Sequence, residues 1–338
     1  MNTDELNKLL KQNTEREQYY LDNPGSISPD YKHMKTKIID GKEVFCFSLD
    51  KLTEKEILIR KDSRYTFVPF YIHSNINMNY IYSGECTYLI NDEYITLHEG
   101  DVCIFDKDVV RAKMKTGEND IVINISMSND FFSDSLINRI GEQSVMASFI
   151  INSLSSKENH NHYLIFQTEK SPKIIELFTS LLMEYYDNNI YSKEIIKSYI
   201  VIIFIELLRI YHTRSGNQLI QISDDSSKIL MDILHYIEKN YSDCNIDDIA
   251  KTFGYHPKYI SYLIKKKTGK TFNEIKLTQR LNIACSYLKN TNLSIQKIAE
   301  KVGITNQSFF YKKFEEYYKI SPNNYRKKNY YNISKTPK

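Results

Sequence analysis

Two related stretches decide the fold of this chain: IDDIAKTFG at residues 246–254 and IQKIAEKVG at residues 295–303. Matched positions are 49 residues apart and carry the same Ile, Ile, Ala and Gly. Apolar residues spaced i, i+3 and i+7 form one stripe along a helix, and the small Ala lets a second helix cross it closely. The sequence therefore predicts the same helix-turn-helix motif twice.

Each copy also has residues that begin and end its first helix. Asn245 and Ser294 stand one residue before the stripe, where an N-cap is favoured. Gly254 and Gly303 supply the left-handed backbone that ends a helix in a tight turn. A second apolar helix is predicted after each turn, with Tyr259, Ile260, Leu263 and Ile264 buried in the first copy and Phe309, Phe310 and Phe314 in the second.

The segment between the two copies predicts a linking helix. Residues 271–274, TFNE, form a capping box, in which Thr271 and Glu274 satisfy the first backbone amides of a helix. Apolar residues then recur at helical spacing as far as Leu288. We expect this helix to fix the spacing between the two motifs.

The last third of the chain resembles the DNA-binding domain of the AraC/XylS family of transcription regulators. Besides the two motifs, the resemblance rests on Thr268-Gly269-Lys270, Arg280-Leu281 and Ser321-Pro322-x-x-Tyr325-Arg326. It implies an all-α domain at residues 224–330 that binds double-stranded DNA through two helix-turn-helix motifs. Three positions depart from the family pattern: Lys319 stands where Gly is usual, Ile304 where Phe is usual and His256 where Ser is usual.

The outward face of each second helix is the predicted DNA-reading surface, because such helices present polar side chains to base edges in the major groove. The predicted base contacts, which the resemblance also assigns to this face, are Lys258, Ser261, Tyr262, Gln307, Tyr311 and Lys312. The predicted phosphate contacts are Asn245, Lys265, Lys266, Asn306, Lys313 and Arg326.

The distribution of charge agrees with a DNA-binding C-terminal domain. The net charge of the chain is only +3, but residues 224–338 hold 21 Lys and Arg against 11 Asp and Glu. The preceding residues hold 24 against 31. A basic helical domain joined to an acidic one is typical of a nucleic-acid binder whose partner domain does not bind DNA.

Other features of the composition predict a cytoplasmic protein. The five cysteines are scattered without a C-x-x-C motif, so we expect buried thiols and neither a disulfide nor a metal site. The N-terminus is polar and acidic, unlike a signal peptide, and the longest apolar run, residues 199–208, is too short to span a bilayer.

The N-terminal half changes to short alternating strands from residue 37 to residue 127. Turn signals such as Ser83-Gly84 and Glu99-Gly100 separate them, and regular hairpin spacing predicts a closed double-sheet jelly roll. Residues 60–127 resemble the cupin-type sensor barrel at the front of many AraC-family regulators. The predicted strands are residues 44–48, 64–68, 78–82, 86–90, 93–97, 101–105 and 121–125.

This predicted barrel lacks the ligands of a metal-binding cupin. Aligned on Gly84, the four ligand positions of such cupins fall on Tyr71, His73, Asn77 and near Arg111, of which only His73 is a competent ligand. We therefore expect no metal, no cofactor and no enzymatic activity. The predicted pocket for a small-molecule effector is lined by Tyr71, His73, Asn77, Tyr80, Tyr82 and Arg111.

Helical periodicity returns at residue 128. The helix at 192–211 has an apolar face wider than one contact needs, which is explained either by an intrachain helical pair or by a homodimer, as the resemblance implies. The expected domains are an N-terminal arm at 1–36, the barrel at 37–127, the helical region at 128–211, a polar linker at 212–223, the DNA-binding domain at 224–330 and a tail at 331–338.

The sequence thus predicts a two-domain, mixed α and β transcription regulator, controlled by an effector bound in the barrel. RNA polymerase is a further candidate partner. Two alternatives are a cupin enzyme fused to a DNA-binding domain and a ligand-independent DNA-binding dimer.

Overall fold

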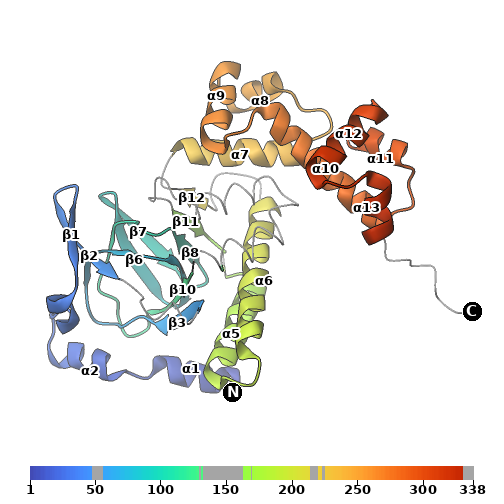
Figure 1. Cartoon of the computed structure of the whole chain (residues 1–338). Coiled ribbons are helices and arrows are strands. Elements are labelled where there is room, and N and C mark those ends of the chain that lie inside the picture. Colours follow the sequence, from blue (N-terminus) through green and yellow to red (C-terminus); the bar gives the residue numbers. More distant parts are fainter. Residues whose placement is uncertain are drawn as a thin grey trace, which may run out of the picture. The chain divides into compact units, whose positions relative to one another are not determined.

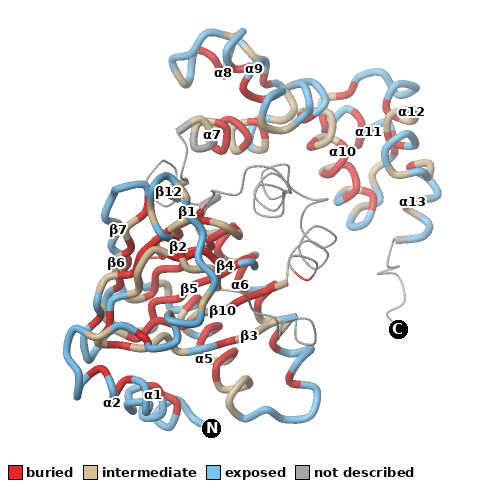
Figure 2. The backbone as a smooth tube through the Cα atoms, turned by 60° about the vertical axis from the view of Figure 1, so that its left-hand side comes forward, coloured by how far each residue is buried: buried red, intermediate tan, exposed pale blue. Residues whose placement is uncertain are grey.

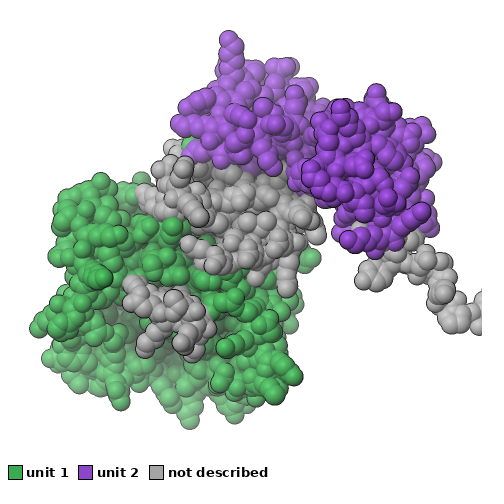
Figure 3. Space-filling model, viewed as in Figure 1, with its two compact units in different colours: residues 1–138, 150–228 green, residues 139–149, 229–338 purple. Residues whose placement is uncertain are grey.

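The computed structural model of the chain describes residues 1–47, 56–128, 131, 163–168, 170–213, 220–222 and 225–329 (Figure 1). The described residues form two compact units, one before Ile229 and one from Ile229 onward (Figure 3). The first is rich in strands and the second is helical, as the sequence predicts. The predicted tail and much of the segment at 128–162 lie outside the described residues.

The N-terminal unit contains two six-stranded sheets. All the strand pairs are antiparallel except β2 with β4. The first sheet, in spatial order, consists of β1 (Thr36–Ile39), β2 (Lys42–Phe47), β4 (Val68–His73), β9 (Arg111–Lys113), β6 (Glu85–Ile90) and β7 (Glu93–His98). The second consists of β12 (Ile220–Ile222), β11 (Tyr163–Phe166), β8 (Val102–Phe105), β5 (Ile76–Ser83), β10 (Ile121–Met127) and β3 (Ile57–Lys61).

The strand pairing differs from the predicted closed barrel. Within the described part of the chain, β1 and β7 are the edges of one sheet and β12 and β3 are the edges of the other, so the pairs do not close into a ring. The strand predicted at residues 64–68 lies mainly in the connection between β3 and β4. Local alternation of residues did not reveal that Arg64 forms a buried ion pair there.

Strands also occur where none was predicted. Near or within residues 37–127 these are β1, β3, β9 and most of β4, and beyond residue 127 they are β11 and β12. β11 lies in the segment that was expected to be helical, and β12 lies in the expected linker. They pair with each other, and β11 pairs with β8, which extends the second sheet. Both strands are short and apolar, so only their tertiary partner distinguishes them from helix or linker. Of the rest of the expected linker, residues 212–213 belong to the end of α6, and residues 214–219 and 223 lie outside the described residues.

The two sheets face each other across a buried interior. Val122, Phe105 and Ile81 of the second sheet form one apolar cluster with Tyr88 and Leu97 of the first. On the outer face of the second sheet, Tyr80 stacks on Phe178 of α5 (Pro172–Asp187), with ring centroids 3.8 Å apart. The centre of the second sheet is therefore buried on both faces. This explains why β8 is buried throughout and why β10 (Figure 2) is buried at every position except the half-buried Asn124.

The helix α6 (Ser192–Thr213) pairs with α5 within the chain. This contact accounts for most of the wide apolar face, since Ile196, Ile200, Ile203, Phe204, Leu207 and Leu208 are buried. Ile195 and Ile202 remain exposed, at 39% and 44%. The intrachain pairing thus leaves a narrow apolar stripe on α6.

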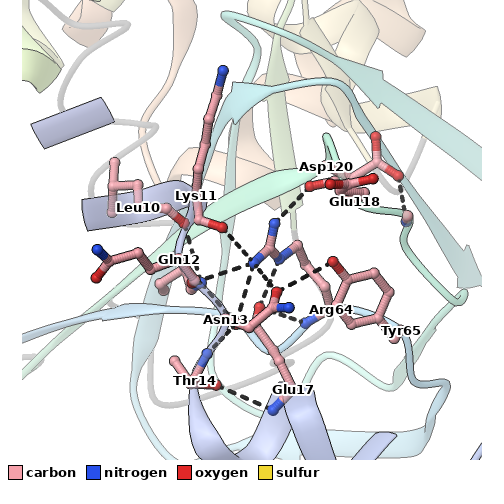
Figure 4. Close-up of polar contacts among 12 residues, drawn as sticks. Leu10, Lys11, Gln12, Asn13, Thr14, Glu17, Arg64, Tyr65, Glu118 and Asp120 are labelled. Carbon is pink, nitrogen blue, oxygen red and sulfur yellow. Dashed lines mark hydrogen bonds and ion pairs between the residues drawn. The ribbon is translucent and has the colours of Figure 1, made fainter. Parts of the chain in front are cut away.

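The N-terminal arm comprises α1 (Thr3–Lys11), α2 (Glu15–Asp22) and the short 3-10 helix η1 (Pro29–His33). A buried carboxylate joins it to the sheets: Glu17 is 0% exposed, and its two oxygens lie 2.8 Å from Arg64 Nε and from Lys61 Nζ. Arg64 also donates to the carbonyls of Lys11 and Glu118 (Figure 4). One arginine therefore holds the arm and the strand connections together.

The C-terminal unit consists of helices whose ends match the predicted signals. Asn245 and Ser294 are N-caps, Thr271 and Glu274 form the capping box, and Gly254 has the left-handed φ of +73°. The helices are α7 (Asp225–Lys239), α8 (Ile246–Phe253), α9 (Pro257–Thr268), α10 (Phe272–Asn290), α11 (Ile295–Lys301), α12 (Gln307–Tyr318) and α13 (Pro322–Asn329).

Replacing Glu17 by Gln should lower the free energy of unfolding of the N-terminal unit by about 3–5 kcal/mol, because Arg64 would stay buried without its carboxylate. Burial tends to raise the pKa of Glu17, but hydrogen bonds from Arg64 and Lys61 outweigh it and hold the pKa at about 2, below the usual 4.5. The ionised group therefore stabilises the fold fully above about pH 4.5, and this contribution is lost as the pH falls toward 2.

Urea unfolding near neutral pH and at about pH 3 measures both effects. The exposed Glu15, changed to Gln, is the control in the same helix. An unchanged acid sensitivity in the Glu17→Gln variant would contradict this account.

Candidate DNA-binding surface and ligand cavity

The first helix-turn-helix motif consists of α8 and α9. The backbone N–H of Gly254, in the left-handed conformation, donates to the carbonyl of Ala250, and α9 begins after the N-cap His256. Ile260, Leu263 and Ile264 are buried against the unit, whereas the predicted base-contact residues Lys258, Ser261 and Tyr262 are all exposed. The helix thus has one packed face and one polar face that is open to solvent.

The second motif, α11 and α12, repeats this arrangement. Phe310 and Phe314 are fully buried, and the predicted contact residues Gln307 and Lys312 are exposed. Tyr311 is half-buried, and its hydroxyl accepts a hydrogen bond of 3.1 Å from Asn323. Phe309, which was predicted to be buried, is 44% exposed, since it lies between the packed face and the open face of α12.

The predicted phosphate contacts fall into three groups. The side chains of Asn245 and Asn306 cap α8 and α12, so these residues lie at helix N-termini, where backbone amides attract anions. Arg326 is half-buried and donates to the carbonyl of Leu293, which gives it a packing role. The remaining three are lysines with neighbours on their own helices: Lys265 donates to Gly269, Lys266 lies over the Tyr262 ring, and Lys313 pairs with Glu316.

A set of contacts that the sequence did not predict joins the linking helix to the loop before the first motif. From the linking helix α10, Arg280 donates to the carbonyls of Tyr241 and Ser242, and Lys276 donates to that of Cys244. Burial lowers the pKa of both cations, and for Lys276 the neighbouring Arg280 adds to the effect. The two cations, one helical turn apart, hold α10 against the loop that precedes α8.

Gly303, in the turn of the second motif, lies against the same loop. A Cβ atom at this position would be 2.6 Å from the carbonyl oxygen of Ser242 and 2.9 Å from the Arg280 guanidinium. By contrast, a Cβ atom on Gly254 would meet nothing within 4 Å. Both glycines have a positive φ. Of the two, only Gly303 also lies so close to the backbone of Ser242 that a side chain would not fit.

The N-terminal unit contains a cavity of about 200 Å³ between the arm and the sheets. Tyr71 and His73 of β4, two residues of the predicted effector pocket, line it together with Phe47 and residues of the arm such as Tyr20 and Tyr31. The contribution of the arm was missed, because sequence alone does not show where a terminal segment packs.

Four of the six predicted pocket residues lie outside the lining of this cavity. Tyr80 stacks on Phe178 of α5, and the hydroxyl of Tyr82 donates to Asn7 of α1, so both face the helices. Asn77 lies on the opposite face of β5, between the sheets, because side chains alternate along a strand. The alternation of side chains along β5 would have predicted that Asn77 faces one side of the sheet and that Tyr80 and Tyr82 face the other.

A polar cluster lies between the sheets behind the cavity wall. Arg111 Nε donates to the Tyr71 hydroxyl at 3.2 Å, and its Nη2 donates to Asn77 Oδ1 at 3.2 Å. The amide of Asn77 in turn donates to Asn124 and Ser126. The interior therefore has an apolar end and a polar end, and the cavity adjoins the polar end.

Metal ligands and membrane-spanning helices are both missing from the described part of the chain. No group of three His, Cys, Asp or Glu side chains is placed there to hold a metal ion. No helix among the described residues is both long enough and apolar enough to cross a membrane.

Comparisons with known proteins agree with the geometry of the C-terminal unit. A family model described as a helix-turn-helix domain matches residues 249–328. The transcriptional activator AarP of Providencia stuartii is 35% identical over 101 residues, which cover 30% of this chain and 75% of AarP. The chain belongs to the AraC family of transcription regulators.

This AraC-family chain matches nearly the full length of one other relative and only a small part of another. The Msm operon regulatory protein of Streptococcus mutans is 26% identical over 271 residues, 79% of this chain and 88% of that protein. The transcriptional regulator YtdP of Bacillus subtilis is 35% identical over 95 residues, and the match covers only 12% of its length. The first is named as an operon regulatory protein, and YtdP is named as an uncharacterized HTH-type transcriptional regulator.

We expect Gly303→Ala to weaken DNA binding more than Gly254→Ala does. Both substitutions cost about 1 kcal/mol in backbone strain, since both positions have positive φ. Only Gly303→Ala also forces the loop at Ser242 away, at a further cost of about 1–3 kcal/mol. Denaturant unfolding and binding to a duplex selected from a random library measure the two effects. Equal losses in the two variants would show that the contact at Ser242 does not set the spacing of the motifs.

Proposed function

We propose that this chain regulates transcription by placing α9 and α12 in successive major-groove segments of one duplex, about 10 base pairs apart. The proposal rests on the amphipathic character of α9 and α12. Each helix buries apolar residues against the unit and exposes polar residues at its N-terminal end. The contacts of Arg280 and Gly303 with the Tyr241–Ser242 loop support a fixed spacing of the helices.

Base recognition is assigned in this proposal to the exposed polar residues of the two helices. Lys258 and Lys312 have the chemistry to donate to guanine acceptors, and Gln307 has the chemistry to pair with an adenine edge. Ser261, Tyr262 and Tyr311 complete the proposed base-contacting set. Lys265, Lys266 and Lys313, together with the capped N-termini at Asn245 and Asn306, would hold phosphates.

Replacing Lys312 by Ala should weaken binding to the selected site by roughly 1–3 kcal/mol and relax the preference at one base pair. The reason is that a base contact contributes to the specific complex and not to binding of random DNA. Competition with random duplex measures both affinities, and Lys239→Ala, an exposed lysine at the end of α7, is the control. Equal weakening on both kinds of DNA would make Lys312 a phosphate contact instead.

Replacing Lys266 by Ala should weaken binding on all sequences and lower the slope of log affinity against log salt by about one, because one fewer phosphate is neutralised. Titrations at several salt concentrations measure the slope, again with Lys239→Ala as control. An unchanged slope would remove Lys266 from the phosphate-contacting set.

We further propose that the N-terminal unit is a cupin-type sensor and that its cavity binds a small-molecule effector. The cavity lies where the arm meets the sheets, and Tyr71 and His73 contribute polar groups to its wall. A homodimer through the exposed stripe of Ile195 and Ile202 on α6 belongs to the same proposal. Contact with RNA polymerase remains a further proposed partnership.

A further inference from the structure

Among the described residues, the buried guanidinium of Arg111 has no counter-charge. The residue is 0% exposed, and its hydrogen bonds go to neutral acceptors, namely the Tyr71 hydroxyl, the Val109 carbonyl and the Asn77 amide. The guanidinium carbon also lies 4.0 Å from the Phe105 ring centroid. Within the described part of the chain, no carboxylate forms an ion pair with Arg111. A buried cation without an anion is costly, so such an arrangement usually serves a function.

His73 brings an unsatisfied polar group to the same place. The residue lines the cavity and is only 8% exposed, and within the described structure its Nδ1 has no hydrogen-bond partner. Burial lowers the pKa of His73 well below its usual value, and the charges of Arg111 and Arg60 add to this effect. The imidazole is therefore neutral, and its N–H can donate to a bound group.

Tyr71 supplies a second donor. Its hydroxyl oxygen accepts from Arg111, which leaves the hydroxyl proton free to be directed toward the cavity that Tyr71 lines. Burial raises the pKa of Tyr71, so the hydroxyl keeps its proton. A cation that donates to a hydroxyl makes that hydroxyl a stronger donor in turn.

Among the described residues, one cation of the cavity wall has no carboxylate partner. Three lining cations have carboxylate partners: Arg16 pairs with Asp30, Lys61 with Glu17 and Lys113 with Asp62. The fourth, Arg60, lies opposite Asn124 on the neighbouring strand β10 and has no carboxylate partner among the described residues. Arg60 and the buried Arg111 together give the site around His73 an excess of positive charge.

We propose that this cavity binds a small organic carboxylate, whose oxygens accept from the Tyr71 hydroxyl, the His73 imidazole and Arg60, in the positive field of Arg111. The inference rests on the proposed sensing function and names the chemical class of its effector. Phe47 and Tyr31 offer an aromatic wall for the carbon skeleton of the ligand. The cavity of about 200 Å³ is smaller than the roughly 300–1,000 Å³ of pockets for drug-sized ligands, so a compact molecule is expected.

The test compares carboxylates with uncharged molecules of the same shape. Butyrate, hexanoate and benzoate are titrated into the full-length protein beside butyramide, hexanamide and benzamide, with inorganic phosphate as a separate arm. Thermal shift and calorimetry report binding, since a ligand that binds only the folded state stabilises it. We expect at least one carboxylate to bind roughly tenfold or more tightly than its amide, because charged hydrogen bonds are stronger than neutral ones.

Variants then locate the site. Arg60→Gln changes an exposed side chain, and it should reduce the carboxylate affinity roughly tenfold and the amide affinity much less, because only the carboxylate also loses an opposite charge. Tyr71→Phe keeps the ring, removes the hydroxyl donor and should act in the same direction. Arg209→Gln, an exposed arginine on α6 outside the cavity, is the matched control and should bind like the wild type.

Four results would overturn the inference: no carboxylate binding, equal binding of carboxylates and amides, equal loss of both in Arg60→Gln, or binding of phosphate as tight as that of the carboxylates. Binding to the library-selected duplex is measured on the same preparations. Selective DNA binding without carboxylate binding would leave the regulator standing and remove this site. Carboxylate binding without any duplex preference would support this site and contradict the proposed sequence-specific DNA binding.

Discussion

The contact between Gly303 and the backbone of Ser242 is the constraint on which the C-terminal unit depends. It brings the turn of the second motif against the loop before the first, and it leaves no room for a side chain. Arg280 binds the same loop through two carbonyls, so the linking helix α10 is joined to both motifs. Two reading helices on one duplex need a fixed separation, and these contacts have the stiffness to provide it.

In the N-terminal unit, buried charge has two different roles. Glu17 is shared by Arg64 and Lys61, so each of these charges contacts an opposite charge and the arm is held to the sheets. Arg111 is buried among neutral groups beside a cavity. The first arrangement stabilises the fold, and its charges contact one another without any ligand. Among the described residues, the second has no anion beside it, which is why we infer binding rather than architecture.

Local signals predicted much of the C-terminal unit. Capping residues, left-handed glycines and apolar stripes act within one helical turn, so the roles of Asn245, Ser294, Thr271 and Gly254 follow from the amino-acid sequence alone. The exposed polar residues of α9 and α12 largely followed from the same periodicity, but Tyr259 and Phe309, which were predicted to be buried, are exposed. The packing of Arg326 did not follow from it, because its acceptor, Leu293, lies 33 residues away.

By itself, the sequence determined which segments of the C-terminal unit form helices, that most strands lie in the N-terminal half, and which polar residues face outward in each motif. Only the tertiary structure showed that Arg64 holds the N-terminal arm against the sheets and that β11 and β12 extend a sheet. It also showed that Tyr80 and Tyr82 face helices instead of the cavity. The reason is physical: periodicity and capping depend on neighbours a few residues apart. The partner of a buried charge or a short strand depends on segments that meet only when the whole chain is folded.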